Sequence, residues 1–524
     1  MARTSAGATV ESTMPVPLPP GAADAPDLHA DPRILADSIA HLTGAPTMLR
    51  STHMSWVVLS GDRVFKLKRP VALDFVDLRS AAARAASCRH ELALNAELAP
   101  GLEIAIRTVL PGPDGAYRLG DDGDPRAIDH VIEMRRFDET RSMRSLLARG
   151  ELTLGQAAEV GVRLARFHRS TDRAPEPVDE RARFDVNADA LLELVREHPA
   201  ATRDVLAAKR FAAAFLTAWS DVLDARFAAG RVVDGHGDVR TEHVLFDHDP
   251  VRIVDRLDLD ALRYLDVADE LAFLAMDLEA HGGVDHVPSV LAGYAQAGGT
   301  LPPTVLLAYY AAYRALVRAK VALLPGAQDG TRAAQRLLPL ARRSRWRARG
   351  PLLLLVTGPP ASGKSTLAAA IGEGSGLPVV SSDATRRRGP ADYGDAARAA
   401  IYRTLARQIA PGASAVVDAT FGEPRLRAAF LDEIGRAERP VLVVECVAPA
   451  DVRMARAEQR DRCEPESLSD ADAGVARVLA ERFLSVPAAL VDGRVAVDTT
   501  AGVEDQVDEI EAWLDRRLAS GILP

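Results

Sequence analysis

The sequence predicts two differently built regions: a mixed α+β region, followed by an α/β domain with a parallel sheet. Near the N-terminus, two short apolar runs joined by Gly61 and Asp62 are typical of a β-hairpin. The middle of the chain has a mainly helical pattern, and after Pro351 apolar strands alternate with helices. Because strands connected through helices run parallel, this last block is expected to carry helices on both faces of its sheet.

Length and composition favour a folded protein of several domains. The chain has 524 residues, of which 48% are hydrophobic and 26% charged. Residues 1–28, rich in Ala, Pro and Gly, lack the apolar segment of a signal peptide and are expected to form a disordered leader. No apolar run is long enough to span a bilayer, and the three cysteines form no metal-like pair. We therefore expect a reduced, cytoplasmic protein without membrane contact.

The elements of the first region follow in order. Strands are predicted over 55–60 and 63–68, a helix over 81–98 and another strand over 128–134. A long helical region reaches about residue 324 and is interrupted by strands and loops at 232–259. The arginine-rich stretch 332–349 is expected to be a solvated connecting helix with an apolar stripe of Leu337, Leu338 and Leu340. The predicted domains are thus 29–325 and 351–524, joined by a linker helix at 326–350.

The last block contains a phosphate-binding sequence. Strands are predicted over 352–357, 379–382, 415–418, 441–447 and 495–497. The pattern G-x-x-x-x-G-K-S, from Gly358 to Ser365, follows the first strand and precedes a helix. Gly358 and Gly363 allow the backbone to wrap a phosphate, Lys364 reaches the β- and γ-phosphates, and Ser365 ligates magnesium. Ser362 and Thr366 are also predicted to bind the cofactor. The predicted cofactors are ATP or GTP with Mg²⁺.

Charged residues follow the next strands of this block. Asp383 is placed to accept a hydroxyl proton, although an acid there could equally cap a helix. Asp418 ends the third strand and is expected to orient magnesium or substrate. Arg453, Arg456 and Arg460 share one helix face, where they could clamp phosphate oxygens or form a solvated basic surface.

With these motifs, about 170 residues resemble the P-loop kinases that include polynucleotide kinases, zeta-toxin kinases and small-molecule kinases such as gluconate kinase. The resemblance rests on the phosphate loop, Ser382-Asp383-x-x-Arg386, Val417-Asp418-Ala-Thr420, Arg456-x-x-x-Arg460 and Ser469-Asp470-Ala471. It implies that Asp383 is the general base, that Arg386 holds the acceptor, and that Arg456 and Arg460 are lid arginines. No AAA-type sensor motif accompanies the loop, so a kinase is expected rather than a motor ATPase.

A second group of polar residues lies in the middle of the chain. The segment from Gly235 to Leu245 reads GHGDVRTEHVL, and Asp255 follows ten residues later. Two such acids could accept a hydroxyl proton and hold magnesium, whereas His-Gly-Asp by itself is usually a turn. Upstream, Lys66 and Lys68 share one side of a strand, and either could pair with ATP phosphates and with Glu91 on the next helix.

This arrangement resembles the aminoglycoside phosphotransferase-like kinases, which share the bilobal protein-kinase fold, over roughly residues 31–324. The resemblance implies that Asp238 is the catalytic base, Asp255 a magnesium ligand, Lys66 the phosphate lysine and Val131–Arg135 the hinge that grips adenine. Asp266 and Asp269 are implied to brace the loop from a helix. Nearly the whole chain resembles a bacterial family usually called bifunctional aminoglycoside phosphotransferase/ATP-binding protein, at Thr52–Trp56, Phe65–Val71 and Ala272–Asp277.

One position departs from the family pattern. Five residues after Asp238 the family has an Asn whose oxygen ligates magnesium, but this chain has His243. Imidazole is a poor magnesium ligand, so the first domain could be slow, use another metal or be a regulatory pseudokinase, with Glu242 as a substitute source of oxygen.

The sequence therefore predicts a two-headed phosphotransferase acting on small-molecule hydroxyl acceptors. The alternatives are a P-loop kinase regulated by an inactive binding module, and a nucleotide-switched interaction protein. The net charge of −9 favours small molecules and leaves a nucleic-acid 5′ end open only for the P-loop half. The acceptors and the oligomeric state are left open.

Overall fold

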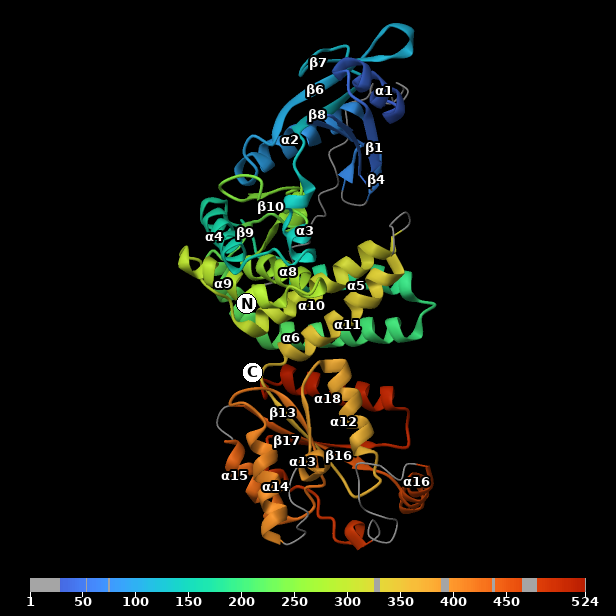
Figure 1. Ribbon diagram of the computed structural model, residues 1–524, viewed down its shortest axis with the longest axis vertical. Coiled ribbons are helices and arrows are strands. Elements are labelled where there is room, and N and C mark those ends of the chain that lie inside the picture. The colour runs from blue at the N-terminus through green and yellow to red at the C-terminus, as the bar shows by residue number, and fades with distance from the viewer. Residues whose placement is uncertain are drawn as a thin grey trace, which may run out of the picture. The chain divides into compact units, whose positions relative to one another are not determined.

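The computed structural model describes residues 29–52, 54–73, 76–324, 330–387, 395–435, 439–463 and 478–523 (Figure 1). Backbone contacts divide the chain into two compact units, one up to Phe137 and one from Asp138 onward. The first unit holds only the beginning of the predicted N-terminal domain. The second holds the helical remainder together with the α/β block. Within the described ranges, no helix is long and apolar enough to cross a membrane.

The first unit is built on an antiparallel sheet of order β1-β2-β3-β8-β6-β7. The strands are β1 (Thr47–Ser51), β2 (Ser55–Ser60), β3 (Arg63–Lys68), β6 (Glu103–Pro111), β7 (Tyr117–Asp121) and β8 (Asp129–Arg135), with a small β4–β5 pair (Ala72–Leu73 and Val76–Asp77). Helix α1 (Pro32–Thr43) packs on β1 and β2, and α2 (Ala81–Leu98) packs on β6 and β8. The predicted hairpin and the bounds of the predicted helix are confirmed.

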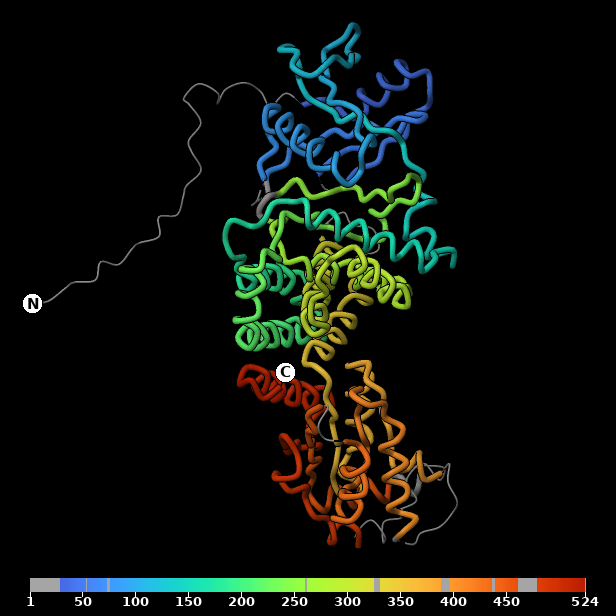
Figure 2. Tube along the Cα trace, turned by 90° about the vertical axis from the view of Figure 1, so that its left-hand side faces the viewer, coloured from blue at the N-terminus to red at the C-terminus, as the bar shows by residue number. Residues whose placement is uncertain are grey.

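The first part of the second unit is mainly helical. Its helices are α3 (Met143–Ala148), α4 (Leu154–Ser170), α5 (Glu180–Val195), α6 (Pro199–Ala228), α7 (Asp260–Arg263), α8 (Val267–Ala280), α9 (Val287–Gln296), α10 (Thr304–Leu323) and α11 (Gly330–Ala348). The predicted strand-and-loop interruption is confirmed: β9 (Val232–Asp234) pairs with β12 (Tyr264–Asp266), and β10 (Val244–Leu245) with β11 (Arg252–Ile253). Helix α10 contacts α5, α8 and α11, so it is the central helix of this part. Figure 2 follows this helical part of the chain along its Cα trace, in green and yellow.

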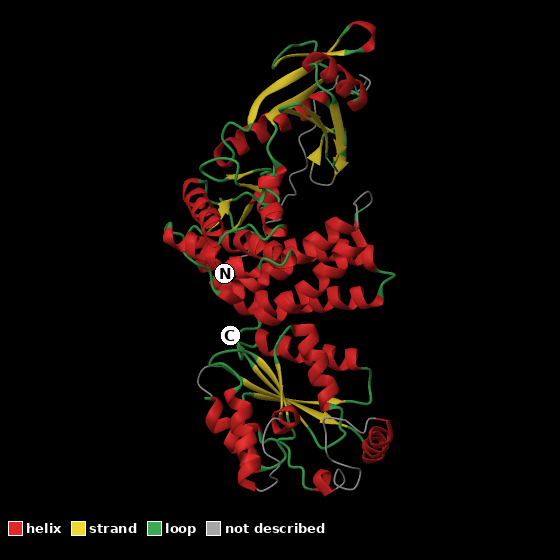
Figure 3. Cartoon of the chain, in the orientation of Figure 1, coloured by secondary structure: helices red, strands yellow, loops and turns green. Residues whose placement is uncertain are grey.

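The last part of the second unit is the predicted parallel sheet, with strand order β14-β15-β13-β16-β17. The strands are β13 (Leu353–Thr357), β14 (Val379–Ser381), β15 (Ala415–Asp418), β16 (Val441–Val447) and β17 (Gly493–Asp498). Alternate residues of β13 face opposite cores. One core includes residues of α12 (Lys364–Ser375) and α18 (Val503–Ala519), and the other includes residues of α14 (Asp395–Arg407) and α15 (Pro424–Ile434). Helices therefore cover both faces, as predicted (Figure 3).

The arginine-rich stretch is a helix, and its arginines are exposed in part, but the prediction that the whole stretch is solvated is wrong. Arg345 of α11 and Arg349, just after the end of this helix, are buried. Arg345 pairs with Glu511 at 3.1 Å and Arg349 with Asp515 at 2.7 Å, while the Trp346 indole donates to Glu511 at 2.9 Å. These acids lie on α18, about 165 residues later, so the local pattern could not reveal them. Burial opposes ionisation of Glu511, but Arg345 and Arg349 outweigh it and lower its pKa to about 2.

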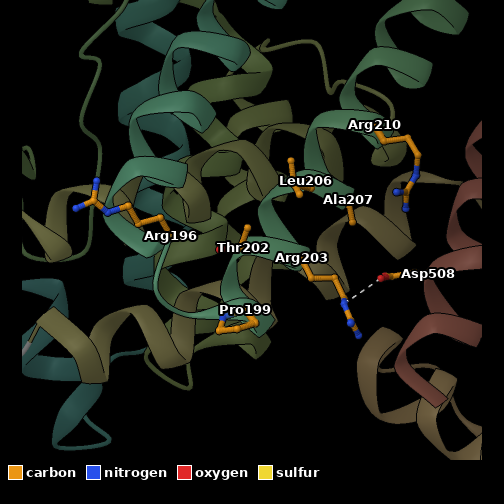
Figure 4. A pocket seen from close by; sticks show the side chains of 8 residues that line it. All are labelled: Arg196, Pro199, Thr202, Arg203, Leu206, Ala207, Arg210 and Asp508. Atoms are coloured by element: carbon orange, nitrogen blue, oxygen red, sulfur yellow. Dashed lines mark ion pairs between the residues drawn. The ribbon is translucent and has the colours of Figure 1, made fainter. Parts of the chain in front are cut away.

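A pocket of about 500 Å³ lies beside this packing, where the start of α6 faces α18 (Figure 4). Arg203 points toward Asp508 and pairs with it at 3.2 Å. The other lining residues are Arg196, Pro199, Thr202, Leu206, Ala207 and Arg210. None of these residues is a predicted site residue. The pocket lies at the rim of the contact between α6 and α18.

Candidate active sites

The loop between β13 and α12 has the backbone of a phosphate cradle. Gly358 has φ 149° and Gly363 has φ 87°, values that residues with a side chain rarely adopt. A Cβ atom at Gly358 would lie 2.5 Å from the Ser362 hydroxyl and 2.8 Å from the Cys446 carbonyl oxygen. Helix α12 begins at Lys364, and Gly363 supplies no capping side chain. The first amide groups of α12 are therefore left to bind an anion.

Polar side chains meet at the carboxyl ends of β13, β14 and β15. Ser381 and Asp418 are paired in register on neighbouring strands. Burial raises the pKa of Asp418, while the charge of Lys364 and hydrogen bonds from Ser365 and Ser381 oppose the rise. The structure thus brings Lys364, Ser365 and Asp418 together, as the sequence predicts.

This group fits a magnesium ion bound together with phosphates. Asp418 is only 7% exposed, and its Oδ1 has no hydrogen-bond partner among the described residues. In the same part of the chain, no cluster of three or more His, Cys, Asp or Glu could hold a metal by itself. Magnesium is typically held by one or two carboxylates together with substrate phosphates, which agrees with this donor set.

The two residues predicted to act on the acceptor substrate, Asp383 and Arg386, lie on α13 (Ser382–Arg387). Asp383 and Arg386 form an ion pair at 3.3 Å, and both side chains are about 30% exposed. Asp383 lies in the first turn of this helix and remains accessible. The arrangement places a carboxylate and a guanidinium side by side at the edge of the sheet next to Asp418.

Arg456, on α16 (Ala450–Cys463), is held beside the phosphate loop by Thr499, which sequence reasoning missed. Arg456 donates to the Thr499 carbonyl oxygen at 2.7 Å and to its hydroxyl at 3.2 Å. The Thr499 hydroxyl in turn donates to the Ser362 carbonyl oxygen at 2.7 Å. Arg460 belongs to α16, but its side chain and the whole of 469–471 lie outside the described residues. No local signal marks Thr499, because its partners come from three separate segments.

In the first unit, Lys66 and Lys68 both contact Glu91. The ammonium of Lys66 lies 2.6 Å from one carboxylate oxygen, and that of Lys68 lies 2.5 Å from the other. The side chain of Lys68 is 3% exposed and that of Lys66 is 20% exposed, so Lys66 is the more accessible lysine. The predicted hinge at Val131–Arg135 belongs to β8, where Ile132 pairs with Lys66.

In the second unit, the predicted catalytic loop holds Asp238 in an ion pair. Arg240 donates to both oxygens of Asp238, at 2.9 and 3.0 Å, and also contacts Glu242. Burial favours the neutral carboxyl, but Arg240 and His243 outweigh it and lower the pKa of Asp238. Asp238 is therefore ionised, with both oxygens engaged.

His243 is held in the loop by hydrogen bonds at both of its ring nitrogens. Its Nδ1 lies 2.8 Å from the Asp238 carbonyl oxygen and must donate, so Nε2 accepts from Arg240 at 3.0 Å. Both ring nitrogens are thereby used, and nitrogen is in any case a poor partner for magnesium. Asp255, with φ 60° and a half-exposed side chain, lies 4.0 Å from Nε2. The residues at this loop do not reproduce the magnesium site that the family pattern implies.

The loop is braced from α8, chiefly by acids that sequence reasoning missed. Glu270 accepts from the Gly237 amide at 2.7 Å, and Asp277 accepts from the Thr241 amide at 2.8 Å and from its hydroxyl at 2.6 Å. The predicted brace Asp269 contacts the loop through Arg314, which pairs with Asp269 at 2.6 Å and donates to the Gly237 carbonyl oxygen.

The other predicted brace, Asp266, caps α8 by accepting from the Ala268 amide. It also pairs with Arg226. Glu270 and Asp277 lie two turns apart on one face of α8, a spacing that could have identified them.

Two family models match the chain. Residues 56–316 match the phosphotransferase enzyme family, and residues 353–484 match a family described as AAA domain. Uncharacterized proteins of Mycobacterium tuberculosis (strain ATCC 25618 / H37Rv) and Mycobacterium bovis (strain ATCC BAA-935 / AF2122/97) are each 34% identical over 464 residues. The match covers 83% of this chain and 89% of each relative.

The chain belongs to the bifunctional aminoglycoside phosphotransferase-like, P-loop ATP-binding protein family. This family member is an enzyme of the kinase type.

Solved structures also resemble parts of this family member. A choline/ethanolamine kinase family protein from Mesorhizobium loti is 16% identical, with a TM-score of 0.38 over 60% of this chain and 92% of that one. A gluconokinase from Sinorhizobium meliloti is 18% identical, with a TM-score of 0.26 over 33% of this chain and 94% of that one.

Proposed function

We propose that the protein is an ATP- and magnesium-dependent kinase with two nucleotide sites, and that the P-loop head transfers a γ-phosphate to a hydroxyl group of a small molecule. The observation that carries the proposal is the cradle at Gly358–Ser365, where a side chain at Gly358 would collide with the loop itself. Its uncapped helix start and the adjoining Asp418 match what a triphosphate with a hard cation needs.

The side chains of the P-loop head divide the work. Lys364 and the α12 amides hold the phosphates, and Ser365 and Asp418 hold magnesium, which supplies neutralisation of the phosphate charge. Asp383 accepts the proton of the acceptor hydroxyl, and its neighbour Arg386 orients the acceptor. Arg456, fixed by Thr499, approaches the phosphates from the side of Gly363.

The hydrogen bonds that engage Asp238 and His243 favour a second candidate function. In it, the first head is a binding module that regulates the P-loop kinase. Arg240 contacts both oxygens of Asp238 and lowers its pKa, which makes it a weaker base, and His243 offers no free nitrogen to a metal. These contacts support a head that is inactive until a ligand rearranges its loop.

The acceptor of the P-loop head is proposed to be a small molecule. The net charge of −9 disfavours a nucleic acid over the whole chain, although a nucleic-acid 5′ end remains an alternative for this half.

ADP release by the full chain tests the proposal. The acceptor panel contains sugars, amino alcohols, nucleosides and an oligonucleotide with a 5′-hydroxyl end. Lys364→Ala is expected to abolish acceptor-dependent release, while Lys209→Ala, at a partly buried lysine of α6 that pairs with Asp189, leaves it unchanged. If Asp238→Asn loses activity toward acceptors that Lys364→Ala still phosphorylates, both heads are active. No loss in Asp238→Asn favours the regulatory module, and full activity of Lys364→Ala contradicts the proposal.

A further inference from the structure

Helix α10 presents two arginines to the catalytic loop of the first head. Arg314 donates to the Gly237 carbonyl oxygen at 3.2 Å and pairs with Asp269 at 2.6 Å. Arg318 lies one turn farther along α10 and therefore on the same face of the helix. This geometry places Arg318 beside the residues that follow Gly237, in the neighbourhood of Asp238.

Arg318 differs from the other arginines around this loop because it has no hydrogen bond or ion pair with any residue in the described part of the chain. Arg240 is paired with Asp238 and Glu242, and Arg144 with Asp277 at 2.9 Å. The acids nearest to Arg318 are therefore already engaged by other guanidinium groups.

The surroundings of Arg318 make its charge costly. Burial lowers the pKa of Arg318, and the charge of Arg240 lowers it further, while Asp238, Glu242 and Asp277 act in the opposite direction. A partly buried guanidinium without a partner loses hydration, and an anion replaces that hydration and also compensates the charge. Its planar fork of donors matches a phosphate or carboxylate group in bidentate geometry.

We propose that Arg318 is the centre of an anion-binding site beside Asp238, which binds the phosphate or carboxylate group of a small-molecule ligand. Arg240 lies on the same side of the loop and can exchange Asp238 for the incoming anion, because the two compete for the same donors. That exchange releases a carboxylate oxygen of Asp238. The site therefore favours a phosphorylated or carboxylated ligand and disfavours a cationic one such as an aminoglycoside.

The inference concerns the first head alone and does not depend on whether the P-loop head is a kinase. Binding is measured by calorimetry on the full chain carrying Lys364→Ala, so that the P-loop contributes little. The probes are glucose 6-phosphate, citrate, glucose, kanamycin and ATP. The variants are Arg318→Gln, the charge-conserving Arg318→Lys, and Arg332→Gln at an exposed arginine of α11 as the matched control.

Glucose 6-phosphate or citrate is expected to bind at least tenfold more weakly to Arg318→Gln, with partial recovery in Arg318→Lys and no change in Arg332→Gln. If ATP loses affinity in Arg318→Gln and the other anions bind nowhere, the anion is the nucleotide's phosphate and the site still stands. Equal binding of every anion to Arg318→Gln and Arg332→Gln overturns the proposal, as does a chain that binds none of them. Binding of kanamycin in preference to the anions overturns the assignment of ligand class.

Discussion

Arg240 holds both carboxylate oxygens of Asp238, through Nε at 2.9 Å and Nη2 at 3.0 Å. Since Nη2 also donates to His243, the residue that replaces the family's asparagine positions an arginine instead of a metal. The predicted base of the first head is thus held in its ionised form by a guanidinium that contacts both oxygens and lowers its pKa. Loosening this ion pair would make Asp238 a stronger base.

Arg240→Ala is expected to raise the pKa of Asp238, because burial is then opposed by less positive charge. In the native protein the lowered pKa means that ionised Asp238 stabilises the fold above pH about 4, and that this stability is lost as the pH falls through the lowered pKa. Removing Arg240 leaves a buried charge unpaired and costs on the order of 3 kcal/mol at pH 7.

Urea unfolding between pH 3 and pH 7 measures both effects. The variant should lose less stability on acidification than the native chain does. Arg332→Ala is the control, and equal pH profiles for Arg240→Ala and the native chain would show that the ion pair does not influence Asp238.

Glu511→Gln is expected to destabilise the second unit by about 3 kcal/mol, since Arg345 and Arg349 lose charge compensation in a buried site. The native pKa of Glu511, about 2, adds stability that is complete above the ordinary glutamate pKa and is lost as the pH falls from about 4.3 toward 2.

Denaturant unfolding at neutral pH checks the Glu511→Gln effect, with Glu509→Gln as the control on the exposed face of the same helix. By the same reasoning, residues 351–524 alone should be markedly less stable than the full chain, because Arg345 of α11 and the adjoining Arg349, the partners of Glu511 and Asp515, are removed. A fragment as stable as the full chain would disprove a structural role for α11.

Gly358→Ala is expected to weaken ATP binding to the P-loop at least a hundredfold. The new Cβ would lie 2.5 Å from the Ser362 hydroxyl, and the positive φ adds strain. Gly155→Ala is the control, because its Cβ would meet nothing closer than the Thr153 hydroxyl at 3.9 Å. Calorimetric titration with ATP and magnesium distinguishes the two. Unchanged affinity in Gly358→Ala would mean that this loop does not hold phosphate.

Thr499→Val is expected to lower the affinity for ATP about tenfold, since the Ser362 carbonyl oxygen and Arg456 lose a hydroxyl partner worth about 1–3 kcal/mol. Thr499→Ser keeps the hydroxyl and should restore most of the affinity. The melting temperature without nucleotide separates this effect from general destabilisation. Equal affinities for Val and Ser would exclude a positioning role of the hydroxyl.

The parallel sheet could be predicted because its signals are local. The runs at 415–418 and 441–447 are mainly apolar, and they are strands β15 and β16 with the same bounds. The phosphate loop was equally accessible, since its glycines, Lys364 and Ser365 follow one another in the sequence.

What the sequence could not reveal are contacts between distant segments. Arg349 looks like a surface residue until Asp515 is placed against it, and Thr499 acquires its meaning only from Ser362 and Arg456. The departure at His243 was visible in the sequence. Its hydrogen bonds, and hence its link to Arg240, depend on the loop conformation.

Transfer of labelled phosphate from γ-labelled ATP to hydroxyl acceptors tests the central claim most directly. The full chain, incubated with magnesium and a metabolite library, is predicted to form a labelled acceptor, and Lys364→Ala is predicted to form none. Label appearing only as free phosphate, or an acceptor labelled equally well by Lys364→Ala, would contradict the assignment of the P-loop head as a kinase.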